Sequence, residues 1–215
     1  MWAVWCERNN RRHGEKCRTL RAACKWAIDI ALDLAQEAAP KIKVKMGAQG
    51  PTGWTKPEAG VLKLNCDGSF NGEKHTGTTG CIVRDSNGRT LGAGARYYGA
   101  LADALHAEAL ALRDGVAFCN RWLGCNLRVE TDCQVLLNFW RNKEKDRAEI
   151  TPILREVERI SKRFSSFEIS YIPRNANLAA HLTAKEASPH NQKCMWVGCV
   201  PKSVMPVVQF ECKPT

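Results

Sequence analysis

Two aspartates at the ends of alternating apolar runs are the residues best placed to do chemistry. Asp67 ends a run that begins at Val61, and Gly68 follows it at once. Asp132 ends a second run, 126–132. If the two runs are parallel neighbouring strands, both carboxylates emerge at the same edge, where open α/β sheets build their sites. We therefore expect the two aspartates to lie close together.

A glutamate supplies the third carboxylate. Glu108 lies three residues after Leu105 and four before Leu112, so it interrupts the apolar stripe of a helix and should face the sheet. An inward-facing carboxylate is unfavourable unless a metal ion or a cationic side chain pairs with it. Oxygen ligands select hard cations such as Mg²⁺ or Mn²⁺, and a pair of such ions can activate water for phosphodiester cleavage. The three carboxylates therefore indicate metal-dependent phosphodiester chemistry.

Each carboxylate also has an ordinary structural explanation. Asp67 can cap a turn, Asp132 can cap the N-terminus of the helix after it, and Glu108 can form a salt bridge with a buried arginine. Taken singly, these explanations are favoured. The convergence of three carboxylates on one sheet edge favours a site.

The elements that must position these residues begin with three strands. They are expected at Val61–Asp67, Gly80–Asp85 and Thr90–Tyr98. Asn87-Gly88 between the second and third is a strong hairpin signal, so the three strands form an antiparallel meander. A helix from Ala100 to about Cys119 then crosses over to the strand 126–132, which makes that strand parallel to the first.

The remaining elements complete a mixed α/β fold. They are helices at about 133–141 and 149–164, a strand at 167–172, and a last helix that holds Leu178 and Ala184 and that Asn175 or Asn177 caps. The expected order is β-β-β-α-β-α-α-β-α, a five-stranded mixed sheet flanked by helices.

Segments outside this domain have a different character. Residues 1–39 have a helical pattern with a basic first half, and residues 40–59 are rich in glycine and proline, as linkers are. The domain itself is expected at 60–187. Residues 188–215 are irregular, with Pro201 and Pro206 breaking any long element, and are expected to form a C-terminal tail.

Composition limits the class of protein. The 215 residues carry a formal net charge of +10, which suits a polyanion such as nucleic acid as well as general solubility. No run reaches eighteen apolar residues, so no membrane span is expected. The cysteines number 11, an odd count without any Cys-x-x-Cys, which indicates reduced intracellular thiols and not a disulfide framework.

Four motifs occur in the order found in ribonucleases H. They are Lys63-Leu64-Asn65-Cys66-Asp67-Gly68-Ser69, His106-Ala107-Glu108-Ala109, Glu130-Thr131-Asp132-Cys133-Gln134 and Arg174-Asn175-Ala176-Asn177-Leu178-Ala179-Ala180-His181-Leu182. Residues 54–187 thereby resemble plant RNase H-like domains related to non-LTR retrotransposons. Residues 2–9 resemble the end of the zinc-binding reverse-transcriptase segment that precedes such domains, so 1–39 looks like a truncated remnant of that segment.

The resemblance implies an RNase H fold and two-metal cleavage of the RNA strand of an RNA–DNA hybrid. It implies that Asp67 bridges two Mg²⁺ or Mn²⁺ ions, and that Glu108 and Asp132 each hold one. The family's fourth ligand is usually aspartate, and His181 occupies the matching position. Imidazole is a poor ligand for Mg²⁺ and a better one for Mn²⁺. The plant relatives often carry Ala-His here, so the histidine is expected as a tolerated fourth ligand.

Four further residues are implied at the nucleic-acid surface. Ser69 and Gln134 would lie near the minor groove of the hybrid, where 2′-hydroxyl groups mark the RNA strand. Asn71 belongs to the same surface, and Arg174 either contacts a phosphate or forms a structural salt bridge. The chain is expected to act as a monomer inside the cell, with nucleus and cytoplasm both open. The alternative is a weak or inactive nucleic-acid-binding domain derived from a retroelement.

Overall fold

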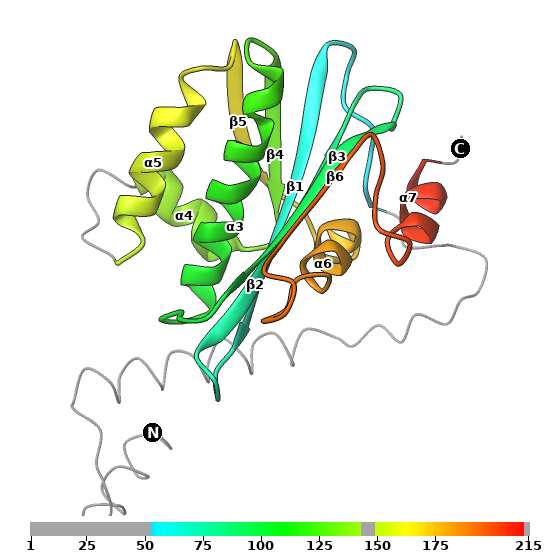
Figure 1. Cartoon of the computed structure of the whole chain (residues 1–215). Helices are drawn as coiled ribbons and strands as arrows, with labels where there is room; N and C mark the ends of the chain where they lie inside the picture. Colours follow the sequence, from blue (N-terminus) through cyan, green and yellow to red (C-terminus); the bar gives the residue numbers. More distant parts are fainter. Residues whose placement is uncertain (1–52, 143–148, 213–215) are drawn as a thin grey trace, which may run out of the picture. The chain divides into compact units, whose positions relative to one another are not determined.

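A six-stranded mixed sheet with the order β5-β4-β1-β2-β3-β6 forms the centre of the structure (Figure 1). This computed structural model describes residues 53–142 and 149–212, all within the unit Met46–Thr215. The expectations for residues 1–39, and for most of the linker, lie outside the described residues. Among the described helices, none has the length and apolar character that a membrane span requires.

The first three strands form the expected antiparallel meander. They are β1 (Val61–Asn71), β2 (Thr76–Arg84) and β3 (Thr90–Tyr98). The turn between β2 and β3 contains Gly88 at φ +80°, a backbone conformation that favours glycine, as the Asn-Gly signal predicts.

The other half of the sheet is parallel, as expected from the crossover helix. Strand β4 (Asn126–Thr131) pairs with β1 from Val61↔Asn126 to Asn65↔Glu130, and β5 (Ser166–Tyr171) pairs with β4. The crossover is α3 (Ala104–Phe118), which continues into the short 3₁₀ helix η1 (Cys119–Trp122).

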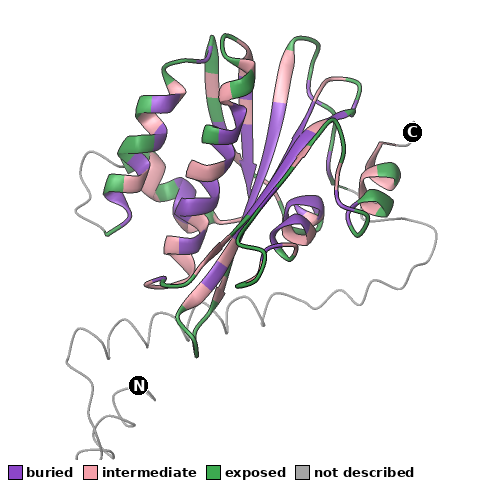
Figure 2. Ribbon diagram, in the orientation of Figure 1, coloured by how far each residue is buried: buried purple, intermediate pink, exposed green. Residues whose placement is uncertain are grey.

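Helices cover both faces of the sheet (Figure 1). On one side lie α3, α4 (Gln134–Asn142) and α5 (Thr151–Ser161), and on the other lie α6 (Leu178–Ala184) and α7 (Met205–Glu211). A further 3₁₀ helix, η2 (Arg174–Ala176), precedes α6. The buried residues concentrate where the α3 layer meets the central strands (Figure 2).

The sequence prediction of five strands is one strand short. Strand β6 (Lys193–Val197) pairs antiparallel with β3 and becomes the outer strand on that side. The segment expected as a tail, 188–215, therefore contains β6 and α7. The other predicted elements are confirmed, with ends that differ by a few residues.

A buried polar cluster joins α7 to the sheet on the α6 side. The Arg84 guanidinium is fully buried, forms an ion pair with Glu211 and donates to Asn65 Oδ1 at 3.0 Å. Asn65 Nδ2 in turn donates to Glu130 Oε2 at 2.9 Å. The ring of Trp54 lies 3.4 Å from the Arg84 guanidinium carbon. This arrangement holds the C-terminal helix against β1, β2 and β4.

Candidate metal centre

Three carboxylates converge where β1 and β4 end their pairing. One oxygen atom each from Asp67, Glu108 and Asp132 lies within 4.8 Å of the others. Within the described residues, this is the one group of three or more acidic, histidine or cysteine side chains close enough to hold a metal ion. The parallel register of β1 and β4 explains the approach of the two aspartates, because each lies two residues beyond the last pair, Asn65↔Glu130.

Two glycines let helices approach the sheet on opposite faces beside Asp67. A Cβ atom on Gly68 would lie 2.5–2.6 Å from the backbone of Ala107 and Glu108, so α3 packs directly on β1 at this residue. Gly80 is paired with Asp67 across β1 and β2, and a Cβ there would lie 2.3 Å from the backbone nitrogen of Ala184 in α6. Close contact of helices with both faces of the sheet thus depends on the lack of a side chain at these two glycines.

The electrostatics of the cluster favour protonation of two of its carboxyl groups. Burial, followed by the negative charges of Asp67 and Asp132, raises the pKa of Glu108 well above its ordinary value. Burial and the charge of Asp67 also raise the pKa of Asp132, against the opposing effect of a hydrogen bond from Asn177. Such mutual repulsion is what a bound cation would relieve.

An unpartnered oxygen atom shows that the donor set fits a metal ion. Glu108 Oε2 is buried and has no hydrogen-bond partner. A buried carboxylate oxygen without a partner is costly, so a cation at this point would satisfy it. Carboxylate oxygens are the donors that Mg²⁺ and Mn²⁺ prefer. Asp67, Glu108 and Asp132 are therefore suited to hold a hard divalent cation.

His181 lies beside the cluster on α6. Its Nδ1 atom is 3.1 Å from Asp67 Oδ2, and its side chain is partly exposed. The structure thus brings the sequence-predicted fourth ligand next to the predicted bridging residue. The contact is direct, so a metal ion held by both groups would have to replace this hydrogen bond.

Asn177 has a role at the centre that sequence reasoning missed. It was expected only as a helix cap, and it does occupy the residue before α6, but its side chain makes no capping bond. Its Nδ2 atom donates at 2.8 Å to the Cys66 carbonyl oxygen and at 2.8 Å to Asp132 Oδ1. It therefore ties α6 to both β1 and Asp132. The available signal was its place four residues before His181, on the same face of a helix.

The side chains predicted to contact nucleic acid are all exposed, but at least one of them already has hydrogen-bond partners. Ser69 and Gln134 are exposed, two residues beyond Asp67 and Asp132 respectively. Asn71 is also exposed, but its Oδ1 atom accepts from the backbone of the β1–β2 turn at 3.0 and 3.1 Å. Arg174 is exposed, has no ion-pair partner among the described residues, and its charge opposes the rise in the pKa of Asp132.

One known protein family matches the part of the chain that holds this centre. Residues 65–187, more than half of the chain, match the family described as reverse transcriptase-like. No curated protein matches the chain significantly.

Solved structures show the same fold at low sequence identity. RNase H1 from the archaeon Halobacterium salinarum is 18% identical with a TM-score of 0.54, over 60% of this chain and 97% of that one. The N-terminal RNase H domain of rv2228c from Mycobacterium tuberculosis is 16% identical with a TM-score of 0.54, over 60% and 94%. LC11-RNase H1, in complex with an RNA/DNA hybrid, is 19% identical with a TM-score of 0.52, over 59% and 95%. The sheet and helices described above thus match an RNase H fold.

Proposed function

The chain belongs to the reverse transcriptase-like family, and on that premise we propose that it is a metal-dependent endonuclease that hydrolyses the RNA strand of RNA–DNA hybrids. The observation that carries the proposal is the buried, unpartnered Glu108 Oε2 atom among two further carboxylates. The RNase H fold of the similar structures, one of them bound to a hybrid, supports the same substrate class.

Each residue of the centre has a defined part in the proposal. Asp67, Glu108 and Asp132 would hold two Mg²⁺ or Mn²⁺ ions, with Asp67 as a ligand of both and His181 as the fourth ligand. Bound ions of this kind activate water and stabilise the leaving oxygen in phosphodiester hydrolysis. Asn177 orients the Asp132 carboxylate through the 2.8 Å hydrogen bond and disfavours its protonation.

Residues around the centre would position the substrate. Ser69 and Gln134 are exposed two residues beyond Asp67 and Asp132, and Asn71 is exposed at the end of β1. All three can donate or accept hydrogen bonds at the minor groove, where 2′-hydroxyl groups distinguish RNA from DNA. Arg174 is an exposed, unpaired cation of the described chain and would contact a phosphate.

A second candidate is a weakly active or inactive domain that binds nucleic acid. The observation in its favour is His181, which replaces a carboxylate and already contacts Asp67 at 3.1 Å. Loss of one anionic ligand weakens the hold on Mg²⁺ more than on Mn²⁺, because imidazole is a poor ligand for the harder ion.

A cleavage assay separates the two candidates. A labelled RNA–DNA hybrid is incubated with the full chain in Mg²⁺ and, separately, in Mn²⁺, beside the variant Asp67→Asn. We expect cleavage of the RNA strand, faster in Mn²⁺, and a loss of at least about 100-fold in the variant, as for removal of a group central to transition-state stabilisation.

The controls show which part of the proposal a negative result would contradict. Binding of the hybrid without cleavage in either metal would contradict the enzyme and favour the binding domain. Cleavage that survives Asp67→Asn would instead show that the hydrolysing site lies elsewhere. A DNA duplex of the same sequence should remain intact throughout.

We also propose an origin and a domain organisation. The four ordered motifs relate residues 60–187 to plant RNase H-like domains of non-LTR retrotransposons, with 1–39 as the remnant of a reverse-transcriptase segment, 40–59 as a linker and 188–215 as a C-terminal extension. The domain is proposed to act as a monomer.

A further inference from the structure

A hollow of about 270 Å³ opens between α3, η1 and the outer strands β3 and β6. The three carboxylates of the metal centre, Asp67, Glu108 and Asp132, do not line it. Its walls consist largely of small side chains, because Cys81 and Gly94 on the sheet face Ala111 and Ala117 on α3. Phe118 closes its floor over Gly94, whose Cβ position lies 3.5 Å from the ring. The hollow is therefore a small recess with an apolar floor, and polar and charged side chains also line it.

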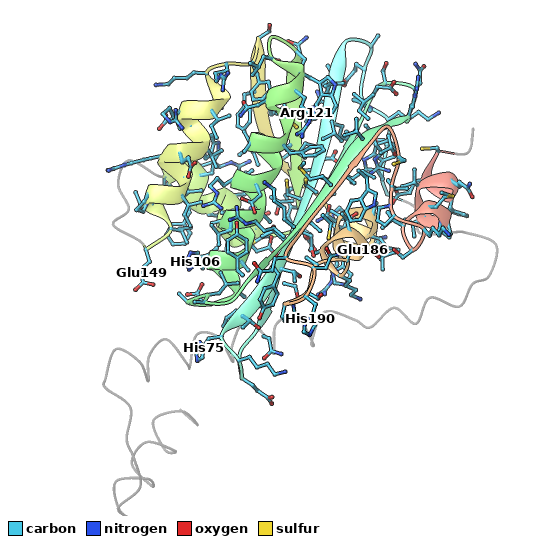
Figure 3. All side chains as sticks on the ribbon, in the orientation of Figure 1. His75, His106, Arg121, Glu149, Glu186 and His190 are labelled. Carbon is cyan, nitrogen blue, oxygen red and sulfur yellow. The ribbon has the colours of Figure 1, made fainter. Side chains whose placement is uncertain are left out.

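Three exposed cations surround the hollow. Arg96, Arg121 and Lys193 come from β3, η1 and β6, and none has an ion-pair partner among the residues that the structure describes. Aromatic rings hold two of them in place, since the guanidinium carbon of Arg96 lies 5.0 Å from the Tyr98 ring and that of Arg121 lies 4.7 Å from the Phe118 ring. Arg121 stands at the far end of the α3–η1 segment from His106 (Figure 3). The cations thus extend along the hollow and away from the metal centre.

The one carboxylate among the described residues that line the hollow, that of Asp114, already has partners within the protein. Asp114 accepts hydrogen bonds from Thr79 Oγ1 at 3.0 Å and from the Tyr98 hydroxyl at 2.7 Å, and it pairs with Arg113 at 2.8 Å. Its charge is therefore balanced within the protein. The recess presents a net positive rim to a ligand.

The sheet register connects the hollow with the metal centre. Gly68, next to Asp67, pairs with Thr79, Thr79 pairs with Arg96, and Arg96 pairs with Lys193. Three strand spacings of about 4.8 Å make about 14 Å. A nucleic-acid strand advances about 3.4 Å per stacked nucleotide and more when it is extended. Because α3 covers Gly68 and Thr79, this is the shortest separation, and a strand that passes around the helix needs at least about four nucleotides to reach the cations.

We propose that this hollow is a subsite for single-stranded nucleic acid: it takes one unpaired base of a strand that leaves the hybrid, while Arg96, Arg121 and Lys193 bind its phosphates. Cations suit phosphate, and a small apolar recess suits a planar base. A base within a duplex is stacked and cannot enter a recess, so the ligand is an unpaired strand. The inference rests on the proposed function for the position of the hybrid itself.

Binding measurements in EDTA test the subsite without cleavage. The probes are a blunt fluorescein-labelled hybrid, the same hybrid with a ten-nucleotide RNA or DNA overhang at either end, and a single-stranded oligonucleotide alone. We expect at least one overhang to tighten binding about fivefold or more, which is the lower end of what one bound base contributes. The single strand alone should bind through the same residues.

Substitutions localise the effect. The triple variant Arg96→Ala/Arg121→Ala/Lys193→Ala should abolish the gain from the overhang. It should also lower the slope of log K against log salt by about two, at about 0.7 for each phosphate that the protein no longer neutralises. The matched control removes three exposed cations from α5 and the residue after it instead, as Arg155→Ala/Arg159→Ala/Lys162→Ala. This control variant should still bind the overhanging hybrid more tightly than the blunt one.

A third variant tests the recess with its charges intact. Ala117 is exposed at the edge of the hollow, and Ala117→Trp should fill the recess and remove the gain without unfolding the domain, which circular dichroism checks. If the triple variant and the α5 control lost the tighter binding of the overhanging hybrid equally, the subsite would be overturned. Equal affinity of the unmodified chain for blunt and overhanging hybrids would also overturn it. Displacement of the single strand by a polyglutamate peptide at equal charge would assign the surface to acidic proteins instead. If the chain fails to cleave the hybrid but still binds the overhanging hybrid more tightly than the blunt one, only the proposed nuclease activity is contradicted.

Discussion

At the scale of single residues, the candidate metal centre consists of four side chains whose charges and hydrogen bonds affect one another. Asp67, Glu108 and Asp132 bring three carboxyl groups together, and His181 contacts the first of them at 3.1 Å. A carboxylate in place of the histidine would add negative charge where the proposed function requires cations to bind. Position 181 is therefore where a single substitution should change metal preference most.

The variant His181→Asp is expected to raise Mg²⁺-dependent cleavage by about tenfold or more, in the range by which changes around metal ligands alter affinity or activity. The rate with Mn²⁺ should change less, because that ion already accepts imidazole. Steady-state cleavage at several concentrations of each metal measures both effects. An unchanged Mg²⁺ dependence would show that position 181 does not limit metal binding.

Glu108 is expected to destabilise the metal-free protein as pH rises. Its pKa is raised in the folded state above the ordinary value of 4.5, so the stability it contributes is complete below that value and is lost as pH rises toward the folded-state pKa. Glu108→Gln should therefore raise Tm in EDTA at pH 8 but not at pH 4. Relief of one buried unsatisfied group is worth about 1–3 kcal/mol, or about 2–12 °C for a chain of this size.

Calorimetry with and without metal checks this prediction. Added Mn²⁺ should stabilise the unmodified chain and leave Glu108→Gln nearly unaffected, since binding to the folded state alone raises Tm. If the variant gains as much stability from Mn²⁺ as the unmodified chain does, Glu108 is a structural carboxylate and not a ligand.

At the scale of elements, the position of α6 depends on one glycine. A Cβ atom at Gly80 would lie 2.3 Å from the Ala184 backbone nitrogen and 2.5 Å from the Ala180 carbonyl oxygen, and neither group can move without the helix. The same helix carries His181, and Asn177 precedes it at its N-terminus. A substitution on β2 should therefore act on the metal centre through α6.

Gly80→Ala is expected to cost about 1–3 kcal/mol through overpacking and to weaken metal binding by displacing His181 and Asn177. Thermal unfolding and Mn²⁺ titration measure the two effects. The control is Gly99→Ala, because Gly99 is exposed and its nearest neighbour to a Cβ lies 4.0 Å away. Equal behaviour of the two variants would mean that α6 tolerates the added methyl group.

The sequence predicted the elements around the centre well because their signals are local. Asn87-Gly88 specifies a hairpin, and the crossover helix implies that β4 is parallel to β1. Strand β6 escaped prediction because its five residues, Lys193–Val197, carry little alternation and are held by pairing with β3. The bonds of Asn177 escaped for the same reason: its partners at Cys66 and Asp132 are 111 and 45 residues away.

At the scale of the whole molecule, the C-terminal helix is tied to the sheet by a buried ion pair. Arg84 and Glu211 are separated by 127 residues in the chain, and their side chains are 0% and 1% exposed. Burial lowers the pKa of Arg84, and the neighbouring Glu211 opposes that effect. Glu211 thus compensates a charge that the fold has removed from water.

Glu211→Ala is expected to cost about 3–5 kcal/mol, because it leaves the Arg84 charge buried without its anionic partner. Urea unfolding measures the change. Glu168→Ala, which removes an exposed partner of the partly exposed Arg128, is the matched control and should cost about 1 kcal/mol or less. The double variant Arg84→Met/Glu211→Leu should recover most of the loss. A cost for Glu211→Ala no larger than that of the control would mean that α7 contributes little to the fold.

The parallel register of β1 and β4 also determines when the centre can exist. Asp67 and Asp132 meet only after Asn65 has paired with Glu130, a pairing that closes a long loop of chain and includes the whole of α3. Long-range parallel pairing forms late in folding, since the entropy of loop closure must first be overcome. A metal ion therefore has no assembled site in the unfolded chain. Its binding should slow unfolding while leaving the folding rate nearly unchanged, so the ion would protect the finished protein and not guide its formation.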